Sequence, residues 1–307
     1  MTGSENTVAV NRRQLIQAGA AGLYAAAVPI AFAQNRANTP VTQAETYETQ
    51  AKGIRTYPGM WRPHYPWEHI AWVSPKWPSQ DYFWLDFPEA IFTQQGLLFL
   101  SHINPSHPTV TPPNLPAVQW QEIPGGIAYQ RTIPHWITFG GKIVRTEQGV
   151  DLELFIRNNS DGLLNGIILQ TCVYLRAIKE FAEYTADNKY VHVADHGWIP
   201  ILQAQSLNAK KDKYAIGWRG GVRNVDLPVI VTFSADKKRL TAFTWFENTN
   251  SLITNPKHPC MHADPTLPDL QPGQSAVIYG KLLFFEGSLA EFDKALKAGR
   301  AGLDFMP

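Results

Sequence analysis

Residues 149–175, GVDLELFIRNNSDGLLNGIILQTCVYL, contain two apolar segments around a group of turn-forming residues. Residues 158–162 favour a turn, because Asn, Asp and Gly adopt left-handed backbone angles at little cost. In the first segment every second residue from Val150 to Ile156 is apolar, which is the period of a half-buried strand. The second segment, Leu163 to Leu175, is almost continuously apolar until Gln170, Cys172 and Tyr174 fall on one face. The pattern predicts a hairpin at the centre of a large β-sandwich.

Short apolar segments separated by turn-forming residues continue on both sides of this hairpin. The expected strands are 81–87, 96–102, 119–123, 127–133, 135–145, 190–201, 214–219, 227–234, 240–247 and 275–286. A short helix is expected over 176–186, and a closing helix begins at Ser288 with Glu291 at the capping-box position. Pro-rich loops are expected over 104–116 and 248–270. This succession predicts an all-β fold, a large antiparallel β-sandwich with one or two short helices, including one at the C-terminus.

The first 33 residues have the pattern of a twin-arginine (Tat) signal peptide. Residues 11–16, NRRQLI, carry the arginine pair, an Ala-rich apolar segment follows, and residues 31–33, AFA, form a small-x-small cleavage site. The apolar segment is too short, and too rich in Ala and Gly, for a good membrane span. We therefore expect the Tat machinery as a partner and a periplasmic or extracellular location. Residues 34–56 are expected to be a flexible linker, and residues 57–307 a single β-sandwich domain.

The charge balance argues against partners that need a strongly charged surface. The chain has 27 basic and 26 acidic residues, with no basic block, so nucleic acid and anionic membranes are not expected to bind. Aromatic residues make up 12% of the chain, including 10 Trp. Large aromatic side chains serve cores and interfaces alike, so they indicate either a core or a platform that stacks on pyranose rings. Both interpretations stay open from the sequence.

Cys172 and Cys260 are the two cysteines of the chain. An exported protein meets an oxidising compartment, in which a disulfide between them is allowed. Their spacing gives no disulfide framework, and a buried thiol at Cys172 is an equal alternative.

Histidines gather in two polar segments. The segments are Thr254–Asp264 and Val191–His196, and their histidines are His258, His262, His192 and His196. Histidines four residues apart bind metals where the backbone aligns them. Prolines on both sides of His258 oppose a helix, so we interpret these side chains as hydrogen-bonded loop histidines and assign no metal ligand.

Glu247 follows the apolar segment LTAFTWF and is the candidate catalytic base. A carboxylate at the end of a buried strand, beside a long loop, is suited to general-base work. An ordinary strand-end carboxylate bound to loop amides is the alternative. His192, His196 and His258 are the candidate acids or substrate donors. The candidate substrate-binding residues are Arg131, His135, Trp245, Asn255, His262 and Cys172.

Residues 247–274, ENTNSLITNPKHPCMHADPTLPDLQPGQ, resemble the late segment of the aldose 1-epimerases, or galactose mutarotases. In that family a catalytic Glu precedes an Asn-x-Pro-like loop and a Leu-x-Pro-Gly-Glu turn. Glu247 matches the base and Asn255 and His258 match the loop. Gln274 replaces the final Glu of the turn.

Residues 170–175, QTCVYL, are similar to the motif Thr-Asn-His-x-Tyr-Phe-Asn-Leu of the same superfamily. The general-acid His of that motif falls at Cys172, so the resemblance implies the β-supersandwich fold of the superfamily's secreted bacterial members and not a true mutarotase. It implies an exported carbohydrate-active protein that binds a sugar or sugar acid and epimerises, cleaves or eliminates it with Glu247 as base. A non-catalytic carbohydrate-binding protein and a metal-dependent oxidoreductase with His258 and His262 as ligands are the alternatives.

Overall fold

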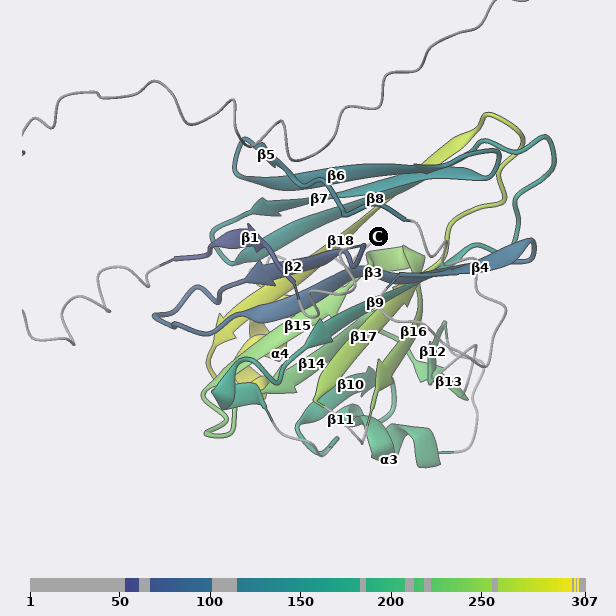
Figure 1. The fold of residues 1–307 in the computed structure, drawn as a ribbon. Coiled ribbons are helices and arrows are strands. Elements are labelled where there is room, and N and C mark those ends of the chain that lie inside the picture. Colours follow the sequence, from purple (N-terminus) through teal and green to yellow (C-terminus); the bar gives the residue numbers. More distant parts are fainter. Residues whose placement is uncertain are drawn as a thin grey trace, which may run out of the picture. The chain divides into compact units, whose positions relative to one another are not determined.

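The computed structural model describes residues 53–60, 67–100, 115–182, 186–207, 213–217, 222–255 and 259–299, together with 301 and 303. Within these residues two nine-stranded sheets pack face to face (Figure 1). The all-β prediction is confirmed. The expected signal peptide and His258 lie outside the described residues.

Sheet A and sheet B are built from strands that come from all parts of the described chain. Sheet A contains, in order, β1 (Thr56–Pro58), β2 (Ile70–Val73), β3 (Phe83–Thr93), β9 (Ile168–Tyr174), β17 (Cys260–Pro265), β16 (Thr249–Thr254), β12 (Tyr214–Ile216) and β13 (Val222–Val225), with β4 (Gly96–Phe99) paired to β3. Sheet B contains β11 (Gly197–Pro200), β10 (Lys189–Val193), β14 (Val229–Phe233), β15 (Arg239–Thr244), β18 (Ser275–Glu286), β8 (Gly149–Asn158), β7 (Ile137–Arg145), β6 (Gly126–Ile133) and β5 (Gln121–Ile123). Among these strands the pairings are antiparallel, apart from β12 and β16, which run parallel.

The alternation predicted around Leu154 is confirmed. In β8 the side chains of Val150, Leu152, Leu154 and Ile156 are at most 1% exposed. They join the core between the two sheets, whereas Asp151 and Arg157 face solvent. A strand that buries one face needs this period of two.

The predicted hairpin between β8 and β9 is wrong. β8 pairs with β7 and β18 in sheet B, whereas β9 pairs with β3 and β17 in sheet A. Residues 158–162 do turn, and the amide of the buried Asn158 donates to the carbonyl oxygens of Gly162 (2.7 Å) and Leu270 (2.9 Å). Because both edges of β8 are taken by other strands, the turn leads the chain across the sandwich to the other sheet.

The prediction of a loop over 248–270 is also wrong, because much of this segment forms the strands β16 and β17. These strands pair antiparallel, and the core contains Leu252 of β16 and the alternate residues Met261 and Ala263 of β17. Pro259 directly precedes β17 and Pro265 ends it. Proline is tolerated at such strand ends, so these prolines bound the strand and do not prevent it.

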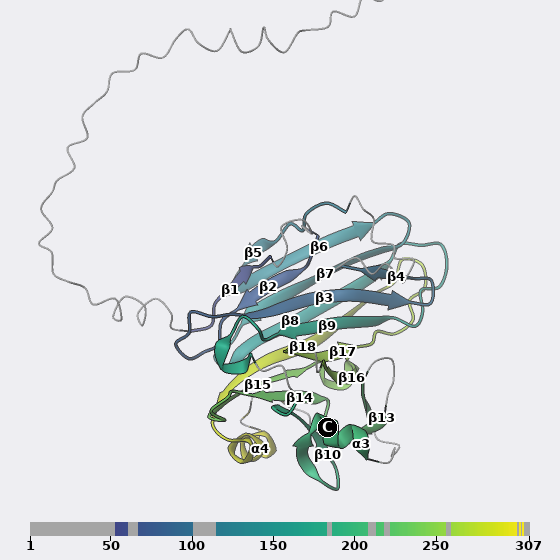
Figure 2. The same cartoon turned by 60° about the horizontal axis from the view of Figure 1, so that its bottom comes forward.

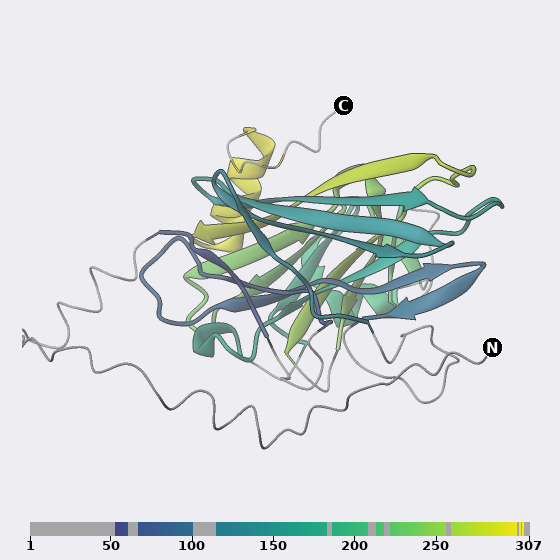
Figure 3. The same ribbon diagram turned by 45° about the horizontal axis from the view of Figure 1, so that its top comes forward.

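The predicted C-terminal helix is confirmed as α4 (Leu289–Lys297), with the capping box of Ser288 and Glu291. Its Phe292 packs against side chains of β14, β15 and β18 on the outer face of sheet B. Figure 3 shows the helix, in yellow, lying against this sheet. The helix expected over 176–186 is reduced to the 3-10 turn η1 (Lys179–Phe181), and a short helix, α3 (Ile201–Ser206), follows β11. No helix among the described residues is long and apolar enough to cross a membrane.

Candidate functional site

The face of sheet A that points away from sheet B carries the main candidate site. In β9, Leu169 and Val173 enter the core between the sheets, so Gln170, Cys172 and Tyr174 lie on the opposite face. We call this face the outer face of sheet A. The strands that contribute to it here, β1, β2, β3, β9 and β17, are consecutive neighbours in the sheet (Figure 2).

Four aromatic side chains cross this face from strand to strand. The register places Tyr57 of β1 opposite Trp72 of β2, Trp72 opposite Trp84 of β3, and Trp84 opposite Tyr174 of β9. The ring centroids are 6.2 Å apart for Trp72 and Trp84, and 6.1 Å apart for Trp84 and Tyr174. Tyr82 lies beside the first pair, 6.2 Å from Tyr57 and 6.3 Å from Trp72. We call Tyr57, Trp72, Trp84 and Tyr174 the aromatic row.

The aromatic row ends at a group of buried polar side chains. Cys260 of β17 lies opposite Tyr174, and His262 lies opposite Cys172. The next outward residue of β17 is Asp264. Glu89 lies in the register shift between β3 and β9, and the Gln170 amide hydrogen-bonds to its carboxylate. The polar cluster therefore consists of Glu89, Gln170, Cys172, Cys260, His262 and Asp264.

His262 is the centre of the polar cluster. Its Nε2 is 3.4 Å from the Sγ of Cys260, and its Nδ1 is 3.7 Å from Oδ1 of Asp264 and 4.0 Å from Oε2 of Glu89. The same Oδ1 of Asp264 accepts a hydrogen bond of 3.1 Å from the backbone N–H of Thr171. The imidazole ring thus lies between a thiol on one side and two carboxylates on the other.

Burial dominates the electrostatics of the polar cluster. It raises the pKa of both Glu89 and Asp264, while the nearby His262 acts in the opposite direction. Burial alone would lower the pKa of His262, but the neighbouring Cys260 and Asp264 outweigh it and raise that pKa well above its ordinary value. The hydrogen bond to Cys260, together with burial, raises the pKa of the Cys172 thiol.

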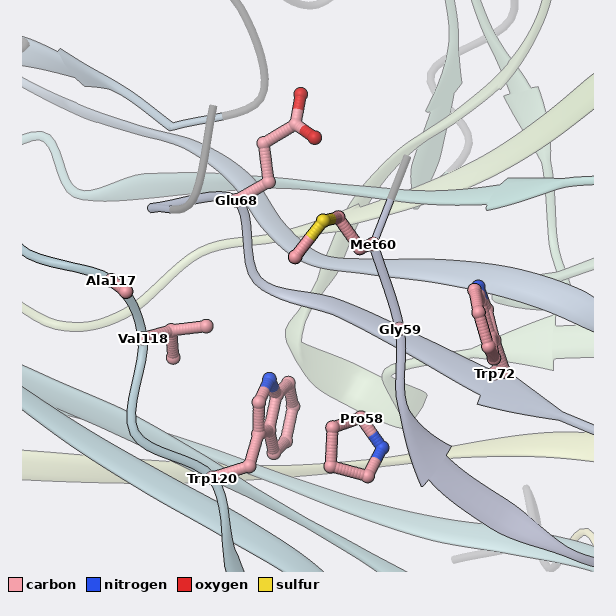
Figure 4. A pocket seen from close by; sticks show the side chains of 8 residues that line it. All are labelled: Pro58, Gly59, Met60, Glu68, Trp72, Ala117, Val118 and Trp120. Atoms are coloured by element: carbon pink, nitrogen blue, oxygen red, sulfur yellow. The ribbon is translucent and has the colours of Figure 1, made fainter. Parts of the chain in front are cut away.

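A pocket of about 230 Å³ lies at the other end of the aromatic row (Figure 4). Its walls are the β1–β2 edge of sheet A and the segment that leads into β5. The lining residues are Pro58, Gly59, Met60, Glu68, Trp72, Ala117, Val118 and Trp120. Trp72 therefore belongs to both the pocket and the aromatic row. The indole N–H groups of Trp72 and Trp120 have no hydrogen-bond partner among the described residues.

The predicted catalytic residues are spread over other elements. Glu247 is exposed in the 3-10 turn η2 (Phe246–Asn248), between β15 and β16. His192 of β10 forms a pair with Asp226, at 2.8 Å between Nδ1 and Oδ1, and its ring lies 5.3 Å from that of Trp198. His196 is exposed in the turn that leads to β11. Their catalytic roles stay predictions.

Of the predicted substrate-binding residues, the structure brings Cys172 and His262 together in the polar cluster. Arg131 is buried and donates to the carbonyl oxygens of Trp67 (3.0 Å) and Pro116. Trp245 is fully buried and stacks on Phe87 in the core. The other two are His135, exposed in the β6–β7 turn, and Asn255, which directly follows β16.

The sequence interpretation missed Glu89. Cys260 and Asp264 lie in the segment Thr254–Asp264 that it singled out, but it gave them no role in the site. The available signal was the alternation of Cys260, His262 and Asp264 at every second position, which places all three on one face if the segment is a strand.

No protein-family model matches the chain, and no curated protein matches it. Among solved structures, it is similar to a galactose mutarotase-like protein from Lactobacillus casei ATCC 334, with 10% identity and a TM-score of 0.39 over 66% of this chain and 85% of that chain. It is also similar to the aldose epimerase homologue from C. elegans, with 8% identity and a TM-score of 0.38 over 78% of this chain and 100% of that chain. At such identities and TM-scores the likeness concerns the fold, and it transfers no substrate or residue role.

Proposed function

We propose that this protein binds a carbohydrate on the outer face of sheet A. The observation that carries the proposal is the aromatic row, which crosses four neighbouring strands and ends at the polar cluster. Sugars combine apolar ring faces with hydroxyl groups. A surface that offers aromatic rings beside carboxylate and amide groups is complementary to both parts.

The side chains of the aromatic row become less exposed from Tyr57 to Tyr174, so a ligand can approach the row from the Tyr57 end. Tyr57 is 49% exposed, Trp72 and Trp84 are half-buried, and Tyr174 is 9% exposed. A sugar that stacks on Trp72 and Trp84 directs its hydroxyl groups toward the polar cluster on one side. On the other side lies the pocket, which is lined by the side chains of Trp72 and Trp120 and by Glu68.

Catalysis is the finer part of the proposal. The bound sugar or sugar acid is epimerised, cleaved or eliminated, with Glu247 as the base predicted from the sequence. Glu247→Gln keeps the shape of the side chain and removes its basicity. It should leave sugar binding intact and lower turnover by about 10²–10⁴-fold. Glu89→Gln is the matched change inside the polar cluster, and it shows which of the two carboxylates the reaction needs. A sugar that binds but is recovered unchanged supports the binding-only alternative.

A thermal-shift screen against neutral sugars and uronic acids tests the proposal. A ligand that binds only the native state raises the melting temperature, with about 2.7 kcal/mol of stabilisation at a hundredfold excess over Kd. At least one sugar class should raise the melting temperature of the wild-type protein and fail to do so in Trp84→Ala. A complete panel without any shift contradicts the proposal.

A further inference from the structure

The polar cluster contains three side chains with the chemistry of metal ligands. The ligand atoms of Cys172, Cys260 and His262 all lie within 4.8 Å of one another. Cys260 is fully buried, His262 is 2% exposed and Cys172 is 7% exposed. The three come from two neighbouring strands, because Cys260 and His262 are two apart on β17 and Cys172 lies opposite His262 on β9. The backbone of the sheet therefore holds them together.

We propose that Cys172, Cys260 and His262 bind a zinc ion. Thiolate and imidazole are the ligands that zinc prefers, and a set of two Cys and one His with an open fourth position is a known type of catalytic zinc site. Tetrahedral zinc with ordinary bond lengths separates a Cys sulfur from a His nitrogen by about 3.6 Å. The Sγ of Cys260 and the Nε2 of His262 are 3.4 Å apart, so this edge of the tetrahedron is already in place.

The surroundings of His262 support the same assignment. Its Nε2 faces the thiol, while its Nδ1 faces the carboxylates of Asp264 at 3.7 Å and Glu89 at 4.0 Å. Metal-bound histidines commonly direct the second ring nitrogen to a carboxylate, which fixes the tautomer and strengthens the ligand. Asp264 is itself held by the backbone N–H of Thr171. The cluster thus contains both the ligands and the groups that orient them.

The zinc proposal does not depend on sugar binding, because the ion can be measured without a sugar present. A disulfide between Cys172 and Cys260 is the competing state of the same two thiols. No disulfide joins the two cysteines in the structure. Thiol counts on the purified protein distinguish the two, since a disulfide leaves no reactive thiol and zinc leaves two that become reactive after chelation.

The test is metal binding by the reduced, folded, full-length protein. Zinc is removed with a chelator and added back, and bound metal is measured by mass spectrometry. The same protein is titrated with Co²⁺, whose thiolate charge-transfer absorption reports sulfur ligands. We expect one equivalent of zinc per chain and a Co²⁺–thiolate band. Cys260→Ser, Cys172→Ser and His262→Ala should each weaken zinc binding at least tenfold. The control Glu122→Gln changes an exposed carboxylate of β5, in sheet B, and should bind zinc as the wild type does.

Circular dichroism and melting curves establish that each variant is folded, and a variant that does not fold is replaced by the Ala or Gln change at the same position.

Asp264→Asn should weaken zinc binding by about 10–100-fold while the Co²⁺–thiolate band stays, because Asp264 acts through His262. Less than a tenth of an equivalent of zinc in the reduced wild type overturns the proposal. Equal zinc affinity in wild type and folded Cys260→Ser also overturns it, as does tight binding of another metal in place of zinc.

Discussion

Leu154 tests the placement of β8 at the scale of a single residue. Its side chain is 1% exposed in the core between the sheets. Leu154→Ala should lower the free energy of unfolding by about 2–5 kcal/mol, because it removes buried methyl groups and leaves a cavity. Urea denaturation measures this change. The exposed Arg157→Ala, three residues along the same strand, should change stability by less than about 0.5 kcal/mol. Equal effects of the two substitutions contradict the register of β8.

His69 gives the protein a predictable dependence on pH. It is fully buried, between Tyr129 and Phe139, with its Nε2 3.4 Å from Nη1 of Arg131. Burial, with the charge of Arg131, lowers its pKa well below 6.5. Below pH 6.5 the unfolded chain therefore binds a proton that the folded chain does not. This favours unfolding by up to about 1.4 kcal/mol for each further pH unit, whereas above pH 6.5 the effect vanishes.

His69→Gln should remove this contribution, so the difference in unfolding free energy between wild type and variant should change between about pH 5 and 7 and be constant above pH 7. Only the difference between wild type and variant isolates His69. His262, whose pKa is raised, contributes to the pH dependence of both proteins with the opposite sign, and this contribution cancels in the difference. Denaturation at a series of pH values measures it. A difference that is constant over the whole range contradicts a neutral, buried His69.

At the scale of elements, the capping box of α4 is a local sequence pattern that fixes where the helix begins. Ser288 accepts a hydrogen bond from the backbone N–H of Glu291, and Glu291 accepts one from the N–H of Ser288. Ser288→Ala should lower the free energy of unfolding by about 1 kcal/mol, as capping substitutions do. Ser275→Ala, at an exposed site at the start of β18, should have little effect on denaturation midpoints. If both variants melt alike, the capping box does not stabilise the helix.

The same comparison explains which elements the sequence predicts. The capping box and the alternation in β8 are local patterns, and both were predicted correctly. The partners of β8 were not, because strand pairing depends on β7 and β18, which are supplied from elsewhere in the chain. The segment from Cys260 to Asp264 was interpreted as a loop from its prolines, although its alternation fits a strand.

Because this segment was predicted to be a loop, the sequence interpretation did not bring the residues of the candidate site together. His262 and Cys172 were recognised as candidates, but their meeting depends on the pairing of β17 with β9. Glu89 is directed into the cluster by a register shift in β3, which no sequence period reports. Tyr57, Trp72, Trp84 and Tyr174 form a row only because their strands are neighbours. The sequence therefore predicts the types of site residue better than their constellation.

At the scale of the whole molecule, we propose that the protein is exported by the Tat machinery and acts outside the cytoplasm. The basis is the Arg12-Arg13 pair and the cleavage motif that ends at Ala33. Replacing both arginines with Lys should retain the full-length protein in the cytoplasm, measured by cell fractionation. Wild-type protein in the exported fraction should lack its first 33 residues by mass spectrometry. Normal export of the double variant contradicts the assignment.

The two sheets share a continuous core, so the described residues should unfold in one cooperative transition. This matters for interpreting every variant above, since a cooperative domain allows changes in stability to be separated from changes in binding. Calorimetry measures it through the agreement of calorimetric and van't Hoff enthalpies. Two separate transitions would mean that the sheets unfold independently.

Sugar affinity across tryptophan variants tests the central claim most directly. Trp84 is the middle of the aromatic row, and Trp136, also half-buried, lies in the β6–β7 turn of sheet B. Isothermal titration with the sugar identified by thermal shift should give a Kd at least tenfold weaker in Trp84→Ala, a loss of about 1.4 kcal/mol. Trp136→Ala should bind as the wild type does. Equal affinity in Trp84→Ala and wild type, with Trp136→Ala weakened, would place the carbohydrate away from the outer face of sheet A and contradict the account.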